Sequence, residues 1–176
     1  MSINDLPEFS RRIDGLRLSA AGEDYEISAR PEELAALAQR FDLLARDRFD
    51  AKVRLTPLPG GYYRLAAEFE AELTQACAVT SEPVPSRVSE SFTLVFGPVE
   101  ESSEIVLDGD AEPVEPLDDG MIDIGEAVAQ QLSLALDPFP RLPGAAFEEE
   151  ADLSPDQTPP ESPFAALARL RKPGQG

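Results

Sequence analysis

The stretch from Phe49 to Phe96 alternates apolar and polar residues, and this pattern limits the chain's options more than any other feature. Apolar residues occupy every second position over residues 49–55 and again over 65–73, and turn-forming residues 57–61 separate the two runs. These two runs predict an antiparallel hairpin with one buried face. The residues of that face are Phe49, Ala51, Val53, Leu55, Leu65, Ala67, Phe69, Ala71 and Leu73.

The polar side of the same hairpin carries opposite charges at matching positions. The predicted register places Lys52 opposite Glu68 and Arg48 opposite Glu72, and cross-strand pairs of this kind contribute up to about 1 kcal/mol each. After Cys77 we expect a turn over Ser81–Pro85 and a third strand over Val88–Phe96.

Shorter elements are predicted before the hairpin. Alternation over Ile13–Ser19 predicts a first strand, and Tyr25–Ser28 a second. Pro31 and the glutamates after it are typical of a helix start, and we expect this helix to end between residues 40 and 44.

The acidic stretch 99–120 is poor in apolar residues, which favours a long exposed loop with at most one edge strand, at Ile105–Leu107. Asp123 followed by Glu126 matches the pattern that caps a helix start. This predicts a second helix from Ile124 to about Leu136.

The fold class we expect is α+β: an antiparallel twisted sheet or small β-barrel of about five to six strands with two packed helices. A single domain would span residues 8–140. The prolines and acidic run that follow predict a flexible linker over residues 141–161. A short C-terminal helix is expected at residues 162–172.

The residue inventory argues against an enzyme. The chain has no histidine and one cysteine, which excludes Ser-His-Asp and Cys-His sites. Cys77 is more typical of a buried, inert residue at a strand end than of a nucleophile. We therefore expect no catalytic residues and no cofactor.

No metal site is expected either. A single thiol cannot form a thiolate zinc site. The run from Asp108 resembles the start of a calcium loop, but Pro113 occupies the position that requires glycine. A two-metal carboxylate site remains a competing reading, as in a metal-dependent nuclease. It would use Asp108, Asp110, Asp118, Asp119 and Asp123.

The net charge of −19 argues against general binding to nucleic acid, and we expect no DNA partner. The charge is uneven, however: residues 1–64 hold 10 basic and 11 acidic residues, and residues 65–150 hold 2 and 20. A basic local face around the hairpin could bind RNA, with tyrosines stacking on bases. The competing reading is a solvated face paired with the acidic strand beside it. The RNA-binding candidates are Arg46, Arg48, Lys52, Arg54, Tyr62, Tyr63 and Arg64.

The acidic half of the chain suggests a different partner. Carboxylates there could hold a basic protein in the manner of a chaperone-like adaptor. The candidates for this role are Asp118, Asp119, Asp123 and Glu126.

No apolar run approaches the roughly 20 residues of a membrane span, and the N-terminus lacks the pattern of a secretory signal. We expect a cytoplasmic protein with no membrane partner.

Three segments in order resemble the YceD family, most closely its alphaproteobacterial branch. They are Gln75–Val84, Asp118–Glu126 and Gln130–Pro140, and the ending Ser162–Leu167 is also similar. The resemblance covers about residues 8–172.

This resemblance implies a cytoplasmic, non-enzymatic factor required for accumulation of large-subunit (23S) ribosomal RNA, through processing or protection of its precursor. The implied partners are that rRNA or its precursor, or a ribosomal protein or assembly factor. Many family members carry paired cysteines that suggest metal binding, near the position of Cys77 and after the late helix. Residues 78–83 and 137–142 contain none here, so a zinc role does not carry over.

Overall fold

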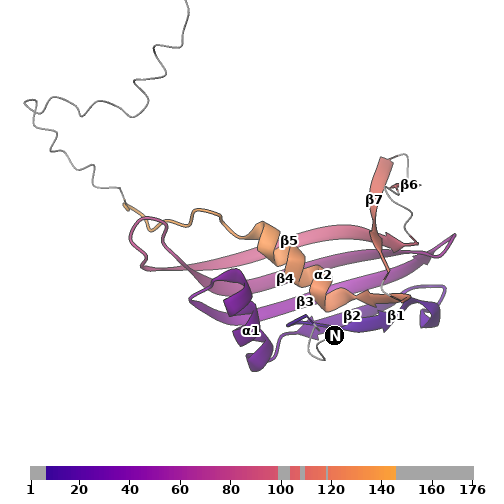
Figure 1. Cartoon of the computed structure of the whole chain (residues 1–176), viewed down its shortest axis with the longest axis horizontal. Coiled ribbons are helices and arrows are strands. Elements are labelled where there is room, and N and C mark those ends of the chain that lie inside the picture. The colour runs from indigo at the N-terminus through magenta and orange to yellow at the C-terminus, as the bar shows by residue number, and fades with distance from the viewer. Residues whose placement is uncertain (1–6, 99–103, 108–109, 118, 146–176) are drawn as a thin grey trace, which may run out of the picture. The chain divides into compact units, whose positions relative to one another are not determined.

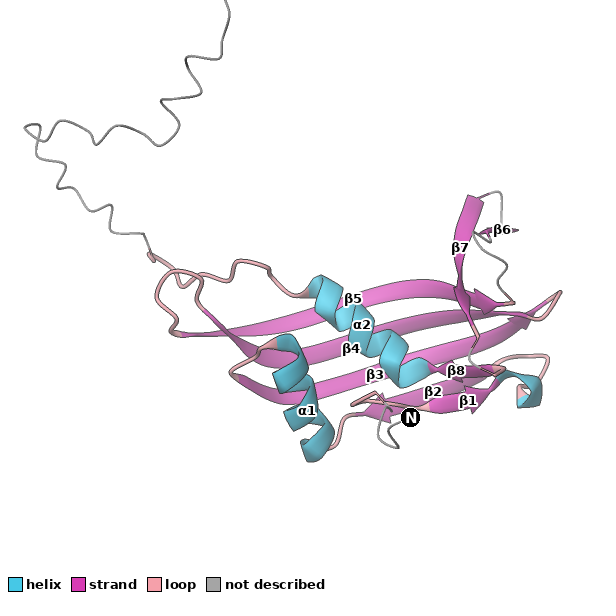
Figure 2. Cartoon of the chain, viewed as in Figure 1, coloured by secondary structure: helices cyan, strands magenta, loops and turns pink. Residues whose placement is uncertain are grey.

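The computed structural model describes residues 7–98, 104–107, 110–117 and 119–145 of the chain. A long antiparallel sheet forms the centre of this part, and two helices pack on it (Figures 1 and 2). In chain order the elements are β1 Arg12–Asp14, a 3₁₀ turn Gly15–Arg17, β2 Glu23–Ser28, α1 Pro31–Phe41, β3 Ala45–Leu58, β4 Tyr62–Ala76, β5 Pro83–Gly97, β6 Glu104–Leu107, β7 Asp110–Pro116, β8 Met121–Asp123 and α2 Ile124–Ala135.

The main sheet has the strand order β2-β3-β4-β5-β7-β6, and β1 and β8 form a separate two-stranded pair. Neighbouring strands run antiparallel except β5 and β7, which are parallel over Val95–Gly97. The α+β class with a mostly antiparallel sheet and two helices is confirmed. The strand order is that of an open sheet, so the barrel form of the prediction is not adopted.

The predicted hairpin is confirmed in its register. Lys52 pairs with Glu68 and Arg48 with Glu72 across β3 and β4, as alternation alone required. One irregularity interrupts the ladder between Arg46 and Arg48, where β3 gains an extra residue. This bulge turns Arg46 to the opposite face of the sheet from Arg48.

Both helices cover the same face of the sheet (Figure 2). On that face the aromatic rings of Phe9, Phe49, Phe69 and Phe92 contact one another in series, with centroids 5.2, 6.0 and 6.2 Å apart. α2 contributes Val128 and Leu132, which are both buried. This apolar layer between the sheet and the helices is the core.

The helix starts are capped by the residues that the sequence indicates. Pro31 stands in the first turn of α1, and the Glu33 carboxylate accepts a hydrogen bond from the backbone N–H of Arg30 at 2.8 Å. Asp123 caps α2 by accepting from the backbone N–H of Glu126 at 3.1 Å. α2 ends one residue before the predicted Leu136.

The predicted bounds of two strands, β1 and β5, were wrong. The first strand stops at Asp14, and the 3₁₀ turn that follows leaves Leu16 86% exposed. β5 begins already at Pro83, inside the segment predicted to turn. Prolines fit there because β5 is an edge strand over that part of its length among the described residues.

The predicted loop over residues 99–120 is also corrected. It contains β6, which includes the predicted strand at Ile105–Leu107, and β7, which pairs with the end of β5. The predicted linker lies outside the described residues from residue 146 onward, as does the predicted C-terminal helix. Both stay predictions. No helix in the described ranges is long and apolar enough to cross a membrane.

Candidate functional site

The face of the main sheet that points away from the two helices is the candidate site, and we call it the open face. Its side chains alternate along each strand with the buried residues of the core. Residues paired across neighbouring strands share a face, so the register assigns the members. They are Asp24 and Glu26 on β2, Arg48, Asp50, Lys52 and Arg54 on β3, Arg64, Ala66, Glu68, Glu70 and Glu72 on β4, and Arg87, Ser89, Ser91 and Thr93 on β5.

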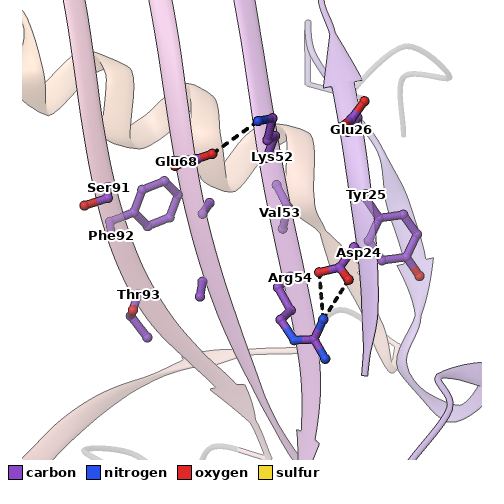
Figure 3. A pocket seen from close by; sticks show the side chains of 12 residues that line it. Asp24, Tyr25, Glu26, Lys52, Val53, Arg54, Glu68, Ser91, Phe92 and Thr93 are labelled. Atoms are coloured by element: carbon purple, nitrogen blue, oxygen red, sulfur yellow. Dashed lines mark hydrogen bonds and ion pairs between the residues drawn. The ribbon is translucent and has the colours of Figure 1, made fainter. Parts of the chain in front are cut away.

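The open face is hollowed along its middle. A groove of about 720 Å³ runs across β2 to β5, and a second hollow of about 400 Å³ adjoins it, sharing Glu26, Lys52 and Glu68 with the first. The lining includes small side chains such as Ala66 and Ser91. Charged side chains project from β2, β3 and β4, among them Asp24, Lys52 and Glu68 (Figure 3). The site is therefore a shallow trough suited to a chain-like ligand.

The three β3 cations of the open face, Arg48, Lys52 and Arg54, each lie beside a carboxylate. Arg54 donates from Nη1 to both carboxylate oxygens of Asp24, at 2.8 and 2.7 Å, and Lys52 Nζ lies 3.6 Å from Glu68 Oε1 (Figure 3). Arg48 pairs with Asp50 on its own strand. Hydrogen bonds from Ser28 and then Arg48 hold the pKa of Asp50 below its ordinary value. The trough thus presents alternating charge instead of a basic strip.

Some RNA-binding candidates lie together on the open face, as the alternation predicted. Arg48, Lys52 and Arg54 are all exposed there, and Arg64 is half-buried beside them on β4. Tyr62 is also half-buried, with its ring against Gly97: a Cβ added to Gly97 would lie 2.2 Å from the ring.

The structure places two other candidates on the helix side of the sheet. Tyr63 is buried, and its ring packs so closely on Gly15 that an added Cβ would lie 2.7 Å from Cζ. Arg46 pairs in register with the buried Leu73. Burial lowers the pKa of Arg46, and its Nε and Nη1 atoms have no hydrogen-bond partner among the described residues. Neither side chain can join a ligand in the trough.

The four acidic residues predicted to bind a basic partner do not form one surface among the described residues. Asp118 lies outside the described residues, and Asp119 is exposed in a turn. Asp123 accepts hydrogen bonds from Ser10 and from the backbone N–H of Arg11, so it ties the N-terminal segment to α2. Glu126 is paired with Arg40 of α1. The last two carboxylates therefore hold the fold together.

The glutamates that line the trough are instead Glu26, Glu68 and Glu70, beside the aspartates Asp24 and Asp50. The signal for the two on β4 was the alternation of the hairpin. Glu26 had only a six-residue strand around it, too short for its face to be assigned without the pairing of β2 with β3.

Cys77 is buried, as expected, where β4 ends. The hydroxyl of Thr80 and the backbone N–H groups of Leu142, Thr80 and Val79 surround its sulfur, and they lower its pKa to about 7. The segment after α2 reaches the same place, where Ala78 N–H donates to the Pro140 carbonyl at 2.7 Å. Over the ranges described, no cluster of three or more cysteine or carboxylate side chains is arranged to hold a metal ion.

Comparison with protein families assigns the chain. The family model described as large ribosomal RNA subunit accumulation protein YceD matches residues 65–171, more than half of the sequence. The chain belongs to the YceD family. The match begins within β4, at residue 65, and includes the rest of β4, all of β5 and α2. No curated protein and no solved structure matches this YceD chain. Membership connects it to accumulation of the large ribosomal RNA subunit.

Proposed function

We propose that this YceD-family chain supports accumulation of large-subunit rRNA as a non-enzymatic binding factor, and that its open face receives a basic protein segment. The supporting observation is the charge pattern of the trough. Arg48, Lys52 and Arg54 each have a carboxylate beside them, and the trough also exposes Glu26 and Glu70. The ligand that fits such a surface carries positive charge of its own.

RNA is the less favourable ligand on the same evidence. Affinity for a phosphate backbone comes from cations that release counterions, and neighbouring carboxylates oppose it. With 34 acidic and 15 basic residues, the chain also repels a polyanion as a whole. A basic ribosomal protein or assembly factor has the opposite charge and is attracted over the same distances.

Direct contact with rRNA is a second candidate, because three cations do share the exposed side of β3. Exposed ion pairs contribute only about 0 to 1 kcal/mol, so a phosphate can compete for Arg48, Lys52 or Arg54. One binding experiment distinguishes a basic protein ligand from an rRNA ligand. A catalytic role is not proposed, since the sequence has no histidine and Cys77 is buried.

The experiment measures binding of the purified full chain to two probes: large-subunit precursor rRNA, and proteins stripped by salt from large ribosomal subunits. One variant reverses the acidic residues of the trough, with Glu26→Lys, Glu68→Lys and Glu70→Lys. A second reverses its bases, with Arg48→Glu, Lys52→Glu and Arg54→Glu. Glu32→Lys, an exposed position on α1, is the matched control.

We expect the wild-type chain to retain one or more basic proteins, and the acidic-reversal variant to lose them while the control keeps them. If the wild type binds rRNA in a salt-dependent manner and only the base-reversal variant loses it, the second candidate replaces the first. Magnesium-dependent cleavage of the precursor rRNA would overturn both, and we expect none.

A further inference from the structure

β5 presents an edge that remains unpaired along most of its length within the described residues. Among the described residues, β7 pairs with β5 only through its last three residues, at Val95–Gly97, and the earlier part of β7 stands away from the long strands (Figure 1). From Pro83 to Leu94 the described strand pairs on one side alone, with β4. An exposed edge of this kind is a template for an additional strand.

The register tells which backbone groups face outward. Cys77 N–H donates to the Glu82 carbonyl at 2.8 Å, so even-numbered residues at the start of β5 direct their backbone groups toward β4. Odd-numbered residues therefore face the edge, and Pro83 and Pro85 are odd, as expected for residues without an N–H to donate. Beyond the prolines, the residues that offer N–H and C=O groups are Arg87, Ser89, Ser91 and Thr93.

A groove runs along the helix side of this edge. It has a volume of about 270 Å³, and it lies between β5 and α2, where Phe92 and Leu134 contribute apolar surface. Leu134 is 77% exposed, so its side chain is accessible to a ligand in this groove. Glu90 is the one ionisable side chain lining this groove among the described residues. A strand added to β5 would place every second side chain here and the others beside Ser89 and Ser91 on the open face.

We infer that the β5 edge binds an extended basic segment of a partner protein by strand addition. Apolar side chains of that segment enter the groove at Phe92 and Leu134, and a lysine or arginine meets Glu90. This inference rests on the proposed function and specifies how the basic segment is held. A second copy of this chain is the less suitable occupant, because two chains of charge −19 repel each other.

The test uses a synthetic peptide of alternating lysine and valine as the probe, with a fully N-methylated version of the same sequence as its control. Binding is measured by calorimetry, and backbone amide exchange of the full chain is recorded by NMR. The decisive variant is Ser89→Pro, which removes an outward N–H at a position in phase with the natural prolines and leaves every charge of the open face in place. Ser89→Ala keeps the N–H and is the matched control.

We expect the peptide to slow exchange at Ser89, Ser91 and Thr93, and Ser89→Pro to weaken binding about tenfold while Ser89→Ala changes it little. The N-methylated peptide should not bind. The N-methylated peptide is tested on the wild-type chain, so it still tests strand addition if Ser89→Pro fails to fold. Equal affinity of both peptides, absence of peptide binding, or exchange protection that depends on protein concentration alone would each overturn the inference. If stripped ribosomal proteins still bind Ser89→Pro as they bind wild type, strand addition is wrong and the proposed function stands.

Discussion

Arg40 of α1 holds Glu126 of α2 with both of its Nη atoms, each 2.8 Å from a carboxylate oxygen. The same guanidinium also reaches Glu8, at 3.0 Å, so one side chain joins the N-terminal segment and both helices. Burial acts to raise the pKa of Glu126, but hydrogen bonds from Arg40 and Gln130 outweigh it and leave that pKa below its ordinary value.

Because Arg40 and Glu126 bind each other, we expect the effects of replacing them on stability to be coupled. Arg40→Ala and Glu126→Ala should each lower the free energy of unfolding, and the double variant should lose less than the sum of the two. The expected coupling is about 1 to 2 kcal/mol, because the pair is bidentate and mostly shielded. Urea denaturation of the four proteins measures it. Strict additivity would show that the two side chains contribute independently.

The lowered pKa of Glu33 should make the free energy of unfolding depend on pH in acid. Hydrogen bonds from Arg11, and then from Arg30, overcome the effect of burial and lower the pKa of Glu33 to about 2 from an ordinary 4.5. The unfolded chain binds a proton at Glu33 more readily than the folded chain does, so stability is lost as pH falls. The contribution of Glu33 is therefore complete above about pH 4.5 and disappears between pH 4.5 and 2.

Glu33→Gln should flatten the stability curve across that window, whereas the exposed Glu32→Gln should leave its shape unchanged. Chemical denaturation at a series of pH values provides the curve. An unaltered slope in Glu33→Gln would mean that other carboxyl groups dominate acid unfolding.

At Gly125 we expect alanine to destabilise the protein, which is the opposite of its usual effect inside a helix. Glycine to alanine within a helix normally stabilises by about 1 kcal/mol. Here the new Cβ would lie 2.1 Å from the backbone oxygen of Phe9, an atom that cannot move without displacing the N-terminal segment. We expect Gly125→Ala to destabilise by about 1 to 3 kcal/mol in urea denaturation. Ser133→Ala, exposed on the same helix, should be close to neutral, and a stabilised Gly125→Ala would disprove this contact.

The lowered pKa of Cys77 should make the free energy of unfolding depend on pH between neutral and about pH 9. With the pKa of its thiol lowered to about 7 from 9.0, the folded chain favours the thiolate more than the unfolded chain does. The contribution of Cys77 should be complete above about pH 9 and decline as pH falls through 7. The difference in unfolding free energy between wild type and Cys77→Ser, measured from pH 6 to 9.5, should therefore grow with pH. A constant difference would contradict the hydrogen bonding described around the sulfur.

The hairpin register was predictable because alternation is a local signal: the parity of Lys52 and Glu68 determines their shared face wherever the strands lie. The same parity assigns Tyr63 to the core together with Leu65, although its aromatic ring suggested base stacking. Arg46 shows the limit of the rule. It has the parity of Arg48, yet the bulge between them reverses its direction, and nothing in the local sequence marks a bulge at that point.

Contacts distant in sequence were harder to predict. β7 has two prolines and few apolar residues, so it lacks the pattern of a strand, and only its last three residues pair with β5, in parallel. Asp123 was predicted correctly as a cap from its spacing to Glu126. Its link to Arg11 required the fold, because 112 positions separate them. For the same reason the acidic candidates Asp123 and Glu126 looked available for a partner although the fold already uses them.

Site-specific photo-crosslinking in cells tests directly whether the open face receives a basic protein. A photoreactive residue at Ala66, which is exposed and lines the trough, is compared with one at Ala35, exposed on α1. We expect the residue at position 66, and not the one at position 35, to crosslink to a basic ribosomal protein of the large subunit or to a basic assembly factor. Crosslinks from Ala66 to rRNA with no protein partner would contradict this expectation.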